Sequence, residues 1–285
     1  MNIREPILSG SWYPSNPKKV DEFLLPFRKN PAGTAVKTPK TGLAAIAPHA
    51  GWYYSGEIAA RSVSGLKNSA DTVVIIGGHL PAGSPVLFAD EDAVRTPYGL
   101  MRIDGELRDL LKKKCGGRAD KYQDNTVEIL VPMVHSFFPD AELLWTRFPG
   151  DLSSYETGKI LAEAGKTLNR GLVVIGSTDL THYGGNYGFS PKGSGEAALS
   201  WVKDTNDADF IRAVLDHNPE EALRCADKHA ACSVGAVLGA MGFIEQIIGT
   251  EQMGIKKAEL LQYGSSADRS GEIPDSFVGY ASILW

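Results

Sequence analysis

The sequence predicts an α/β fold: a single domain with a mixed, largely parallel central sheet flanked by helices. Three short runs, at residues 43–47, 72–76 and 172–175, are almost wholly apolar, as expected of strands buried on both faces. Segments with helical spacing separate these runs, so strands and helices alternate along the chain. The 285 residues contain no internal repeat and no linker-like stretch, and we therefore expect one domain over residues 1–285.

In the first half of the chain, the expected helices carry boundary signals. Ser55 is expected to cap a helix after the first buried strand, and Asp104 to cap another that ends at two consecutive glycines. Pro132 lies within a third helical pattern and predicts a late start or a kink there. The elements predicted after the first strand are a helix over 56–66, strands over 72–79 and 86–89, and helices over 105–115 and 126–138.

Apolar spacing defines most elements in the second half of the chain. The longest uncharged stretch, 230–244, is rich in glycine and shorter than a membrane span, so we interpret it as part of a buried helix. We expect strands over 141–145, 172–175, 258–263 and 277–284, and helices over 153–168, 197–202, 208–215, 219–225 and 232–248.

Composition narrows the possible partners and the compartment. A net charge of −5 at pH 7 gives no electrostatic reason to expect nucleic acid or an anionic membrane surface as a partner. The one dense basic run, 112–114, falls late in a predicted helix, where cations favour the helix dipole. Three cysteines are too few for a disulfide framework, which favours a reducing compartment. The N-terminus resembles no targeting sequence, so we expect a cytoplasmic protein.

Two histidines lie where a predicted buried strand runs out into a loop. His49 follows the strand at 43–47, and His79 ends the strand that begins at Thr72. In open α/β sheets, ligands bind in the crevice beyond the carboxyl ends of the strands. Two imidazoles delivered to that edge by neighbouring strands could share one metal ion, so the placement predicts a metal site.

The third buried strand also ends in ionisable and hydroxyl residues. It opens into a Gly-Ser-Thr-Asp turn that carries Asp179, and His182 follows three residues later. This spacing suits a carboxylate–imidazole pair, in which the carboxylate orients the ring and raises its basicity for proton transfer. An ordinary surface turn is the alternative interpretation.

Cys232 is the candidate third metal ligand. It opens the most apolar predicted helix, where the helix dipole lowers the pKa of a thiol and a metal would deprotonate it. The alternatives are a small apolar residue packed in the core, or a local zinc site. For the local site, Cys225, His229 and Cys232 are spaced so that they would share one face of a continuous helix.

Several short motifs, in the same order along nearly the whole chain, resemble those of the Memo family. That family includes the bacterial and archaeal AmmeMemoRadiSam system protein B, and its fold is similar to that of class III (LigB-type) extradiol dioxygenases. The motifs are Gly-Ser-Trp-Tyr-Pro at 10–14, Ala-Pro-His-Ala-Gly at 47–51, Gly-Gly-His at 77–79, Thr-Pro-Tyr-Gly at 96–99, Asn-Thr-Val-Glu at 125–128, Ser-Thr-Asp-Leu-Thr-His at 177–182, Cys232 with Gly235, Tyr-Gly-Ser-Ser at 263–266 and Val-Gly-Tyr-Ala at 278–281.

The resemblance implies a set of site residues and one partner. It assigns His49, His79 and Cys232 to one metal ion, and places Asp179 and His182 in the same cleft. It also places the motif of Asn125 and Glu128 along the cleft, with Asn125 where relatives usually carry a histidine. A functional link to a radical SAM protein is implied as well.

These residues lead to three hypotheses about function. The preferred one is a metal-dependent redox protein, a non-haem oxygenase-like enzyme with one divalent ion, iron first and copper or zinc as alternatives. His182, paired with Asp179, would move protons. The second hypothesis is a non-catalytic module that binds a peptide or small anion in the same cleft, and the third is a zinc-dependent hydrolase.

Overall fold

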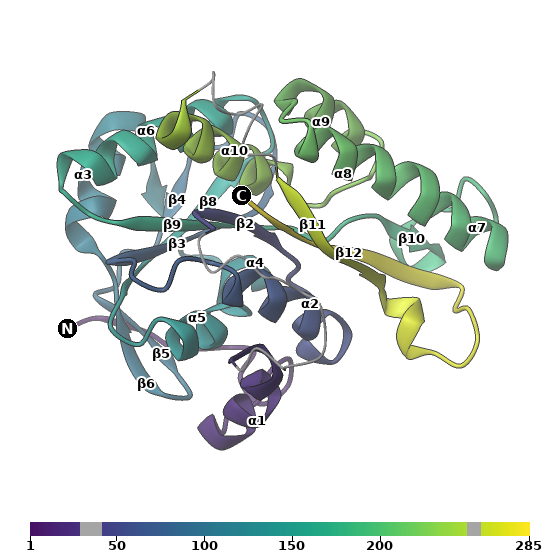
Figure 1. Cartoon of the computed structure of the whole chain (residues 1–285), viewed down its shortest axis with the longest axis horizontal. Helices are drawn as coiled ribbons and strands as arrows, with labels where there is room; N and C mark the ends of the chain where they lie inside the picture. Colours follow the sequence, from purple (N-terminus) through teal and green to yellow (C-terminus); the bar gives the residue numbers. More distant parts are fainter. Residues whose placement is uncertain (29–41, 250–257) are drawn as a thin grey trace.

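A computed structural model describes residues 1–28, 42–249 and 258–285, and a mixed β-sheet runs through its centre (Figure 1). Within these residues the sheet has nine strands in the order β10-β12-β2-β9-β3-β8-β4-β7, with β11 also paired to β12. The middle four, β2, β9, β3 and β8, are parallel to one another. The strands of this sheet are β2 (Ala44–Ala47), β3 (Thr72–Leu80), β4 (Leu87–Phe88), β7 (Arg118–Ala119), β8 (Glu142–Pro149), β9 (Leu172–Ser177), β10 (His182–Gly184), β11 (Glu259–Ser265) and β12 (Ser276–Leu284).

The parallel strands are apolar on both faces because each face is covered by its own layer of helices. Val73 and Ile75 of β3 belong to one apolar cluster, whereas Val74 and Ile76 belong to the other. Successive side chains of a strand point to opposite faces, so a doubly covered strand has no polar position to alternate with. The unbroken apolar runs in the sequence follow from this arrangement.

Two different groups of helices cover the two faces. The first apolar cluster, which contains Val74 and Ile76, includes residues of α3 (Gly105–Cys115), α6 (Ser153–Thr167), α8 (Asp207–Leu215), α9 (Pro219–Ala226) and α10 (Val234–Ile248). The second includes residues of α1 (Pro17–Arg28), α2 (Trp52–Ser64), α4 (Asn125–Glu128) and α5 (Val131–Phe137). Figure 1 shows these two groups on opposite sides of the sheet. The predicted α/β fold, a mixed sheet flanked by helices, is confirmed.

A separate three-stranded sheet and four short helical segments complete the described structure. The small sheet pairs β1 (Ile3–Arg4) with β5 (Ala93–Thr96), and β5 with β6 (Gly99–Arg102). The remaining segments are α7 (Glu196–Trp201), two 3₁₀ turns at Gly185–Tyr187 and Ser266–Arg269, and a π-helical turn at Val202–Asn206. None of the helices among the described residues is both long and apolar enough to cross a lipid bilayer.

Most predicted elements are found close to their expected bounds. Asp104 accepts a hydrogen bond from the backbone N–H of Leu107 at 2.9 Å and caps α3 as expected. The predicted helix over 126–138 is divided into α4 and α5, and Pro132 falls in the first turn of α5, where its missing N–H costs nothing.

The starts of two helices differ from the predicted ones, and several elements were not predicted, among them the short strands β1, β7 and β10. The helix predicted over 56–66 begins at Trp52, because the chain turns into it at Gly51. Ser55 therefore lies inside the helix and does not cap it, and its hydroxyl donates to the carbonyl of Ala50. The helix α10 begins at Val234, so Cys232 lies in the loop before it rather than at its first residue. The sequence patterns also missed α1 and the β5–β6 hairpin.

Glycines allow α10 to pack directly on its neighbours. A Cβ atom at Gly242 would collide with the backbone carbonyl of Tyr155 in α6, and one at Gly158 of α6 would collide with the carbonyl of Gly239 in α10. At the other end of the helix, a Cβ atom at Gly235 would likewise collide with the carbonyl of Pro149, at the end of β8. The glycine spacing in this helix therefore serves close packing.

Replacing Gly242 with alanine is expected to destabilise the fold. The new methyl group would have to displace backbone atoms of α6, and overpacking of this kind costs about 1–3 kcal/mol or more. Gly271→Ala is the matched control, because a Cβ there meets open space. Equilibrium unfolding in urea measures both variants, and equal stability of the two would contradict this account of the packing.

Candidate metal centre

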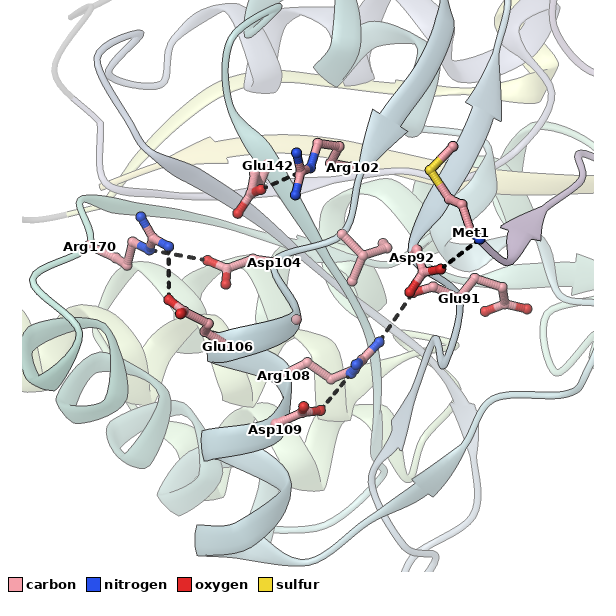
Figure 2. Close-up of a pocket in the computed structure, with 12 residues that line it drawn as sticks. Met1, Glu91, Asp92, Arg102, Asp104, Glu106, Arg108, Asp109, Glu142 and Arg170 are labelled. Atoms are coloured by element: carbon pink, nitrogen blue, oxygen red, sulfur yellow. Dashed lines mark hydrogen bonds and ion pairs between the residues drawn. The ribbon is translucent and has the colours of Figure 1, made fainter.

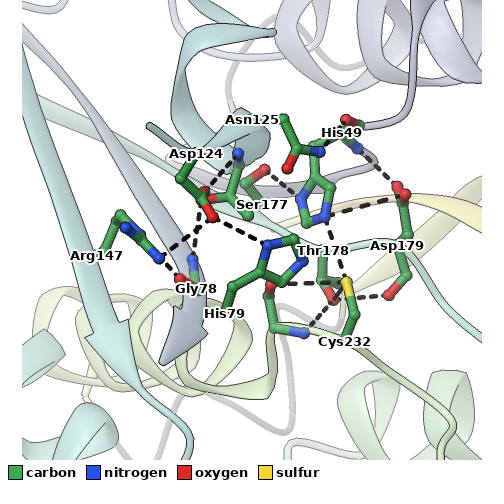
Figure 3. A network of polar contacts seen from close by, with 12 residues as sticks. His49, Gly78, His79, Asp124, Asn125, Arg147, Ser177, Thr178, Asp179 and Cys232 are labelled. Carbon is green, nitrogen blue, oxygen red and sulfur yellow. Dashed lines mark hydrogen bonds and ion pairs between the residues drawn. The ribbon is translucent and has the colours of Figure 1, made fainter. Parts of the chain in front are cut away.

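The carboxyl ends of three adjacent parallel strands meet the loop before α10. His49 lies two residues beyond β2, Asp179 two residues beyond β9, and His79 near the end of β3; β9 runs between the other two strands. One ligand atom from each of His49, His79 and Cys232 lies within 4.8 Å of the others (Figure 3). The structure therefore brings together the three residues for which the sequence predicted a common metal ion.

Hydrogen bonds fix the ring of His49 with one nitrogen facing Cys232. The side chain is buried, and its Nδ1 lies 3.0 Å from the Oγ of Ser177, the last residue of β9. Its backbone N–H donates to Oδ1 of Asp179 at 2.7 Å. The other ring nitrogen, Nε2, is 3.3 Å from the Sγ of Cys232. His49 thus presents Nε2 as a potential ligand atom.

His79 is oriented from the opposite side by a carboxylate. Its Nδ1 lies 3.1 Å from Oδ2 of Asp124, and Arg147 contacts the same oxygen at 3.2 Å. Arg147 also donates from Nε to the carbonyl of Gly78 at 2.9 Å, so it ties Asp124 to the end of β3 (Figure 3). Histidines that bind a metal through one ring nitrogen usually hydrogen-bond a carboxylate, a backbone carbonyl or a water through the other.

The backbone around these residues is closely fitted. His79 has a positive φ of 56°, which turns the chain sharply at the end of β3. Gly78 precedes it, and a Cβ there would collide with the side chain of Ser233. The backbone N–H of Ser233 donates to Oγ1 of Thr178 at 3.1 Å, and that of Cys232 donates to the carbonyl of Asp179 at 3.2 Å. The loop carrying Cys232 is therefore attached to the end of β9.

The three cysteines differ in the ionisation of their thiols. Burial alone would raise the pKa of Cys232, but His49, His182 and His79 around it hold the pKa well below its usual value. Burial raises the pKa of Cys115 to about 11, and it also raises the pKa of Cys225. The thiolate is the form that binds metals, so Cys232 is the cysteine whose surroundings favour metal binding.

The same charges act in reverse on the histidines. Burial opposes protonation, yet Asp124 and the Cys232 thiolate raise the pKa of His79 to about 10. For His182, burial is likewise outweighed by Asp179 and Cys232, and its pKa rises to about 9. The pKa of buried His49 is raised too, by Asp179 and Cys232. The carboxylates and the Cys232 thiolate therefore stabilise positive charge at this position, which is also what a bound metal cation would require.

His182 and Asp179 lie beside this group, and they face each other at ion-pair distance without a direct hydrogen bond. Nε2 of His182 is 3.9 Å from Oδ2 of Asp179, which is too long for a hydrogen bond. Oδ1 of Asp179 instead accepts from the backbone of His49. Within the described part of the chain, the buried Nε2 of His182 has no hydrogen-bond partner. Its ring therefore keeps a free nitrogen near Cys232.

The two residues assigned to the cleft by resemblance make different contacts. Asn125 lies next to the group, and its Nδ2 donates to the carbonyl of His49 at 3.0 Å. Glu128 is buried, and its carboxylate accepts from the backbone N–H groups of Ile7 and Leu8 and from the hydroxyl of Tyr13. These bonds anchor the N-terminal segment, whereas a role of Glu128 in ligand binding stays a prediction.

The alternative zinc site at Cys225, His229 and Cys232 is wrong. The helix α9 ends at Ala226, and His229 follows in a turn with a positive φ of 66°. The ring of His229 lies against Phe189, with 4.4 Å between centroids. Among the described residues, the group whose ligand atoms converge consists of His49, His79 and Cys232. The break after α9 separates the three residues that a continuous helix would have aligned.

Sequence reasoning missed the residues that orient the ligands. The side chain of Ser177 contacts His49 and that of Asp124 contacts His79, while Arg147 holds Asp124 and the carbonyl of Gly78. Asp124 also caps α4, since its side chain accepts from the backbone N–H of Thr126 at 2.8 Å. That local capping signal was present in the sequence, but it gives no indication of the contact with His79.

A buried carboxylate supports the turn between Asp179 and His182. Asp207, at the start of α8, accepts from the backbone N–H of Thr181 at 3.1 Å and from the hydroxyl of Tyr263 at 2.8 Å. The π-helical turn at Val202–Asn206 leads directly into Asp207. Burial raises the pKa of Asp207 to about 6, although Thr181 and Tyr263 favour its ionised form.

This raised pKa predicts a stability that falls with pH. An unfolded aspartate titrates at about 3.9, so between about pH 4 and 6 the folded chain holds a proton that the unfolded chain has lost. Relative to Asp207→Asn, which cannot titrate, the wild type should lose about 2 kcal/mol of unfolding free energy between pH 4 and 7. Parallel pH profiles of the two proteins in urea unfolding would contradict the assignment.

A pocket lies at the opposite edge of the sheet, where the parallel strands begin (Figure 2). It has a volume of about 810 Å³, and Glu142 at the start of β8 and Arg170 just before β9 contribute to its lining. Its charged side chains are engaged with one another: Arg170 contacts Glu106 at 3.1 Å, and Arg102 contacts Glu142 at 3.4 Å. These pairings leave the strand carboxyl ends as the stronger candidate site.

Known proteins are similar to this chain over its full length. The family model described as Memo-like protein matches residues 4–284. A MEMO1 family protein of Pyrococcus abyssi is 32% identical over 301 residues, covering 99% of each chain. One from Pyrococcus horikoshii is 31% identical over 298 residues, covering 99% of this chain and 98% of its own. One from Pyrobaculum arsenaticum is 29% identical over 300 residues, covering 100% and 99%. The chain, with its histidines and cysteine gathered at one edge of the sheet, belongs to the Memo-like protein family.

Proposed function

We propose that this protein binds one divalent metal ion through His49, His79 and Cys232 and uses it as a mononuclear redox centre of the non-haem oxygenase type. The observation that carries the proposal is the convergence of two imidazoles and one thiol within 4.8 Å, at the strand ends where α/β proteins bind ligands. Ser177 and Asp124 hold the outer nitrogens of the two rings, so that the inner nitrogens remain for an ion.

The donor set supports a transition metal rather than magnesium or calcium, which prefer oxygen ligands. Two histidines and one anionic ligand have the ligand count of the two-histidine, one-carboxylate triad in non-haem iron oxygenases, with a thiolate in place of the carboxylate. We therefore place iron first, and copper second because thiolate is a soft ligand. A bound redox-active ion would supply electron transfer and open coordination positions.

The protein's own groups provide ligand orientation and a site for proton exchange. The unpartnered Nε2 of His182 lies near the centre, and a pocket of about 260 Å³ opens beside His182 and Cys232. We assign His182 the task of exchanging a proton with a molecule in this pocket. Asp179 would balance the charge of the histidinium from 3.9 Å away.

Anaerobic loading with Fe²⁺, followed by exposure to oxygen, tests the redox proposal. We expect the wild type to retain about one iron per chain, and the bound iron to oxidise faster than in Asp124→Asn, in which the partner of His79 is weakened. Loading with zinc is the parallel arm. Hydrolysis of esters under nitrogen by the zinc form, together with slow iron oxidation in the iron form, would contradict the redox proposal in favour of a hydrolase.

A further inference from the structure

The pocket beside Cys232 is lined by aromatic rings and small aliphatic side chains, and polar atoms also face it. Tyr187, Phe189 and His229 contribute rings, and Leu180 and two alanines contribute aliphatic surface. Among the described residues that line it, none is lysine, arginine, aspartate or glutamate. Its volume of about 260 Å³ is slightly below the range of roughly 300–1,000 Å³ that holds drug-sized ligands. The pocket therefore suits a small molecule.

The aromatic side chains are already arranged in neighbouring pairs. Phe189 and His229 have centroids 4.4 Å apart and planes inclined by 32°, and His182 and Tyr187 have centroids 4.9 Å apart. Phe189 is further supported from behind by Tyr183 and Trp201. Rings held in this way can stack on a planar guest at little cost in conformational entropy.

The charges around the pocket do not favour an anionic ligand. Phosphate and carboxylate sites in proteins commonly use arginine or lysine, which are absent from these walls. Burial and the nearby Asp179 carboxylate raise the pKa of Tyr187, so its hydroxyl is neutral and available for hydrogen bonding at neutral pH. A dianionic group would find only imidazoles as cationic partners and would lie close to a thiolate and a carboxylate.

We infer that this pocket binds a small, uncharged, planar ring beside the metal centre, with Phe189 and His229 as the residues that select its shape. The inference deepens the proposed function, because such a ring would be the molecule that exchanges a proton with His182. Ring binding itself depends on the walls and not on the ion. His229, a ligand only in the alternative zinc site, acts here as a wall of the pocket.

Binding of three matched probes tests the inference by saturation-transfer NMR on the full chain. Phenol is planar and neutral, cyclohexanol has a similar size without a planar ring, and phenyl phosphate adds a charge to the ring. We expect phenol to bind more tightly than the other two. Equal or tighter binding of phenyl phosphate would overturn the inference in favour of an anion site, and equal binding of cyclohexanol would remove the planar selectivity.

Two wall variants locate the binding site. Loss of one stacking partner is expected to weaken phenol binding roughly two- to tenfold in His229→Ala and in Phe189→Ala. His229 is exposed, so its variant should fold even where Phe189→Ala does not. Tyr122→Ala, an exposed tyrosine outside this pocket, is the control. Unchanged phenol affinity in His229→Ala would overturn the assignment of the walls.

Metal-free and zinc-loaded protein are measured side by side. Phenol binding without any metal uptake would contradict the proposed function and leave the ring pocket in place. Metal uptake without phenol binding would contradict the ring pocket and leave the metal centre in place.

Discussion

Cys232→Ser and His49→Ala are each expected to lower the metal content from about one ion per chain to near zero after anaerobic loading and gel filtration. Each change removes one of the three protein ligands, and a serine hydroxyl stays protonated where a thiolate would bind. Losing an orienting residue alone typically costs 10–100-fold in metal affinity, so loss of a ligand should cost more. Elemental analysis of the purified proteins measures the effect.

Cys225→Ser is the matched control, since it makes the same chemical change seven residues away. Its thiol contacts Glu221 at 3.5 Å and lies outside the converging group. We expect this variant to retain the metal. Loss of metal from Cys225→Ser with retention in His49→Ala would contradict the centre proposed here and revive a site local to α9.

Glu128→Ala is expected to destabilise the protein by about 3 kcal/mol or more. The carboxylate accepts from Ile7 N–H, from Leu8 N–H at 2.8 Å and from the Tyr13 hydroxyl at 3.0 Å. A buried donor left without an acceptor costs about 1–3 kcal/mol, which applies in full to the Tyr13 hydroxyl, and the partly buried N–H groups of Ile7 and Leu8 cost toward the low end of that range. Urea unfolding measures the loss, and hydrogen exchange at Ile7 and Leu8 should show that the N-terminal segment is released first.

Two further variants separate this anchoring role from a general effect of charge. Glu128→Gln retains one carbonyl oxygen as an acceptor, so it should cost less than the alanine variant. Glu156→Ala removes an exposed carboxylate of α6 and should change stability by no more than about 0.5 kcal/mol. Unchanged exchange at Ile7 and Leu8 in Glu128→Ala would contradict the anchoring role.

The fold could be predicted because its core strands are covered on both faces. The runs around Ile46, Ile75 and Ile175 are apolar at successive positions, a pattern that few structures other than a covered parallel strand require. The hairpin β5–β6 gave no comparable signal, since its short strands mix buried and exposed positions. The start of α2 at Trp52 was missed because Gly51, which precedes it, makes no side-chain capping bond.

The ligand residues could be predicted from their places in the sequence, whereas their supports could not. His49 follows β2 and His79 lies near the end of β3, and the carboxyl ends of these strands share an edge of the sheet, so local pattern was enough to expect them together. The contact of Asp124 with His79 spans 45 residues, and that of Arg147 with Gly78 spans 69. Such contacts arise from tertiary packing, which a single sequence leaves unspecified. Glu128 illustrates the same limit, because its partners lie at the N-terminus.

X-ray absorption spectroscopy of the anaerobically loaded iron protein counts the sulfur and nitrogen ligands around the ion. We expect a single sulfur ligand together with imidazole nitrogens in the wild type and in Cys225→Ser, and no sulfur around any ion that remains in Cys232→Ser. An ion surrounded only by oxygen and nitrogen in the wild type would contradict this expectation, as would a sulfur ligand that persists when Cys232 is replaced.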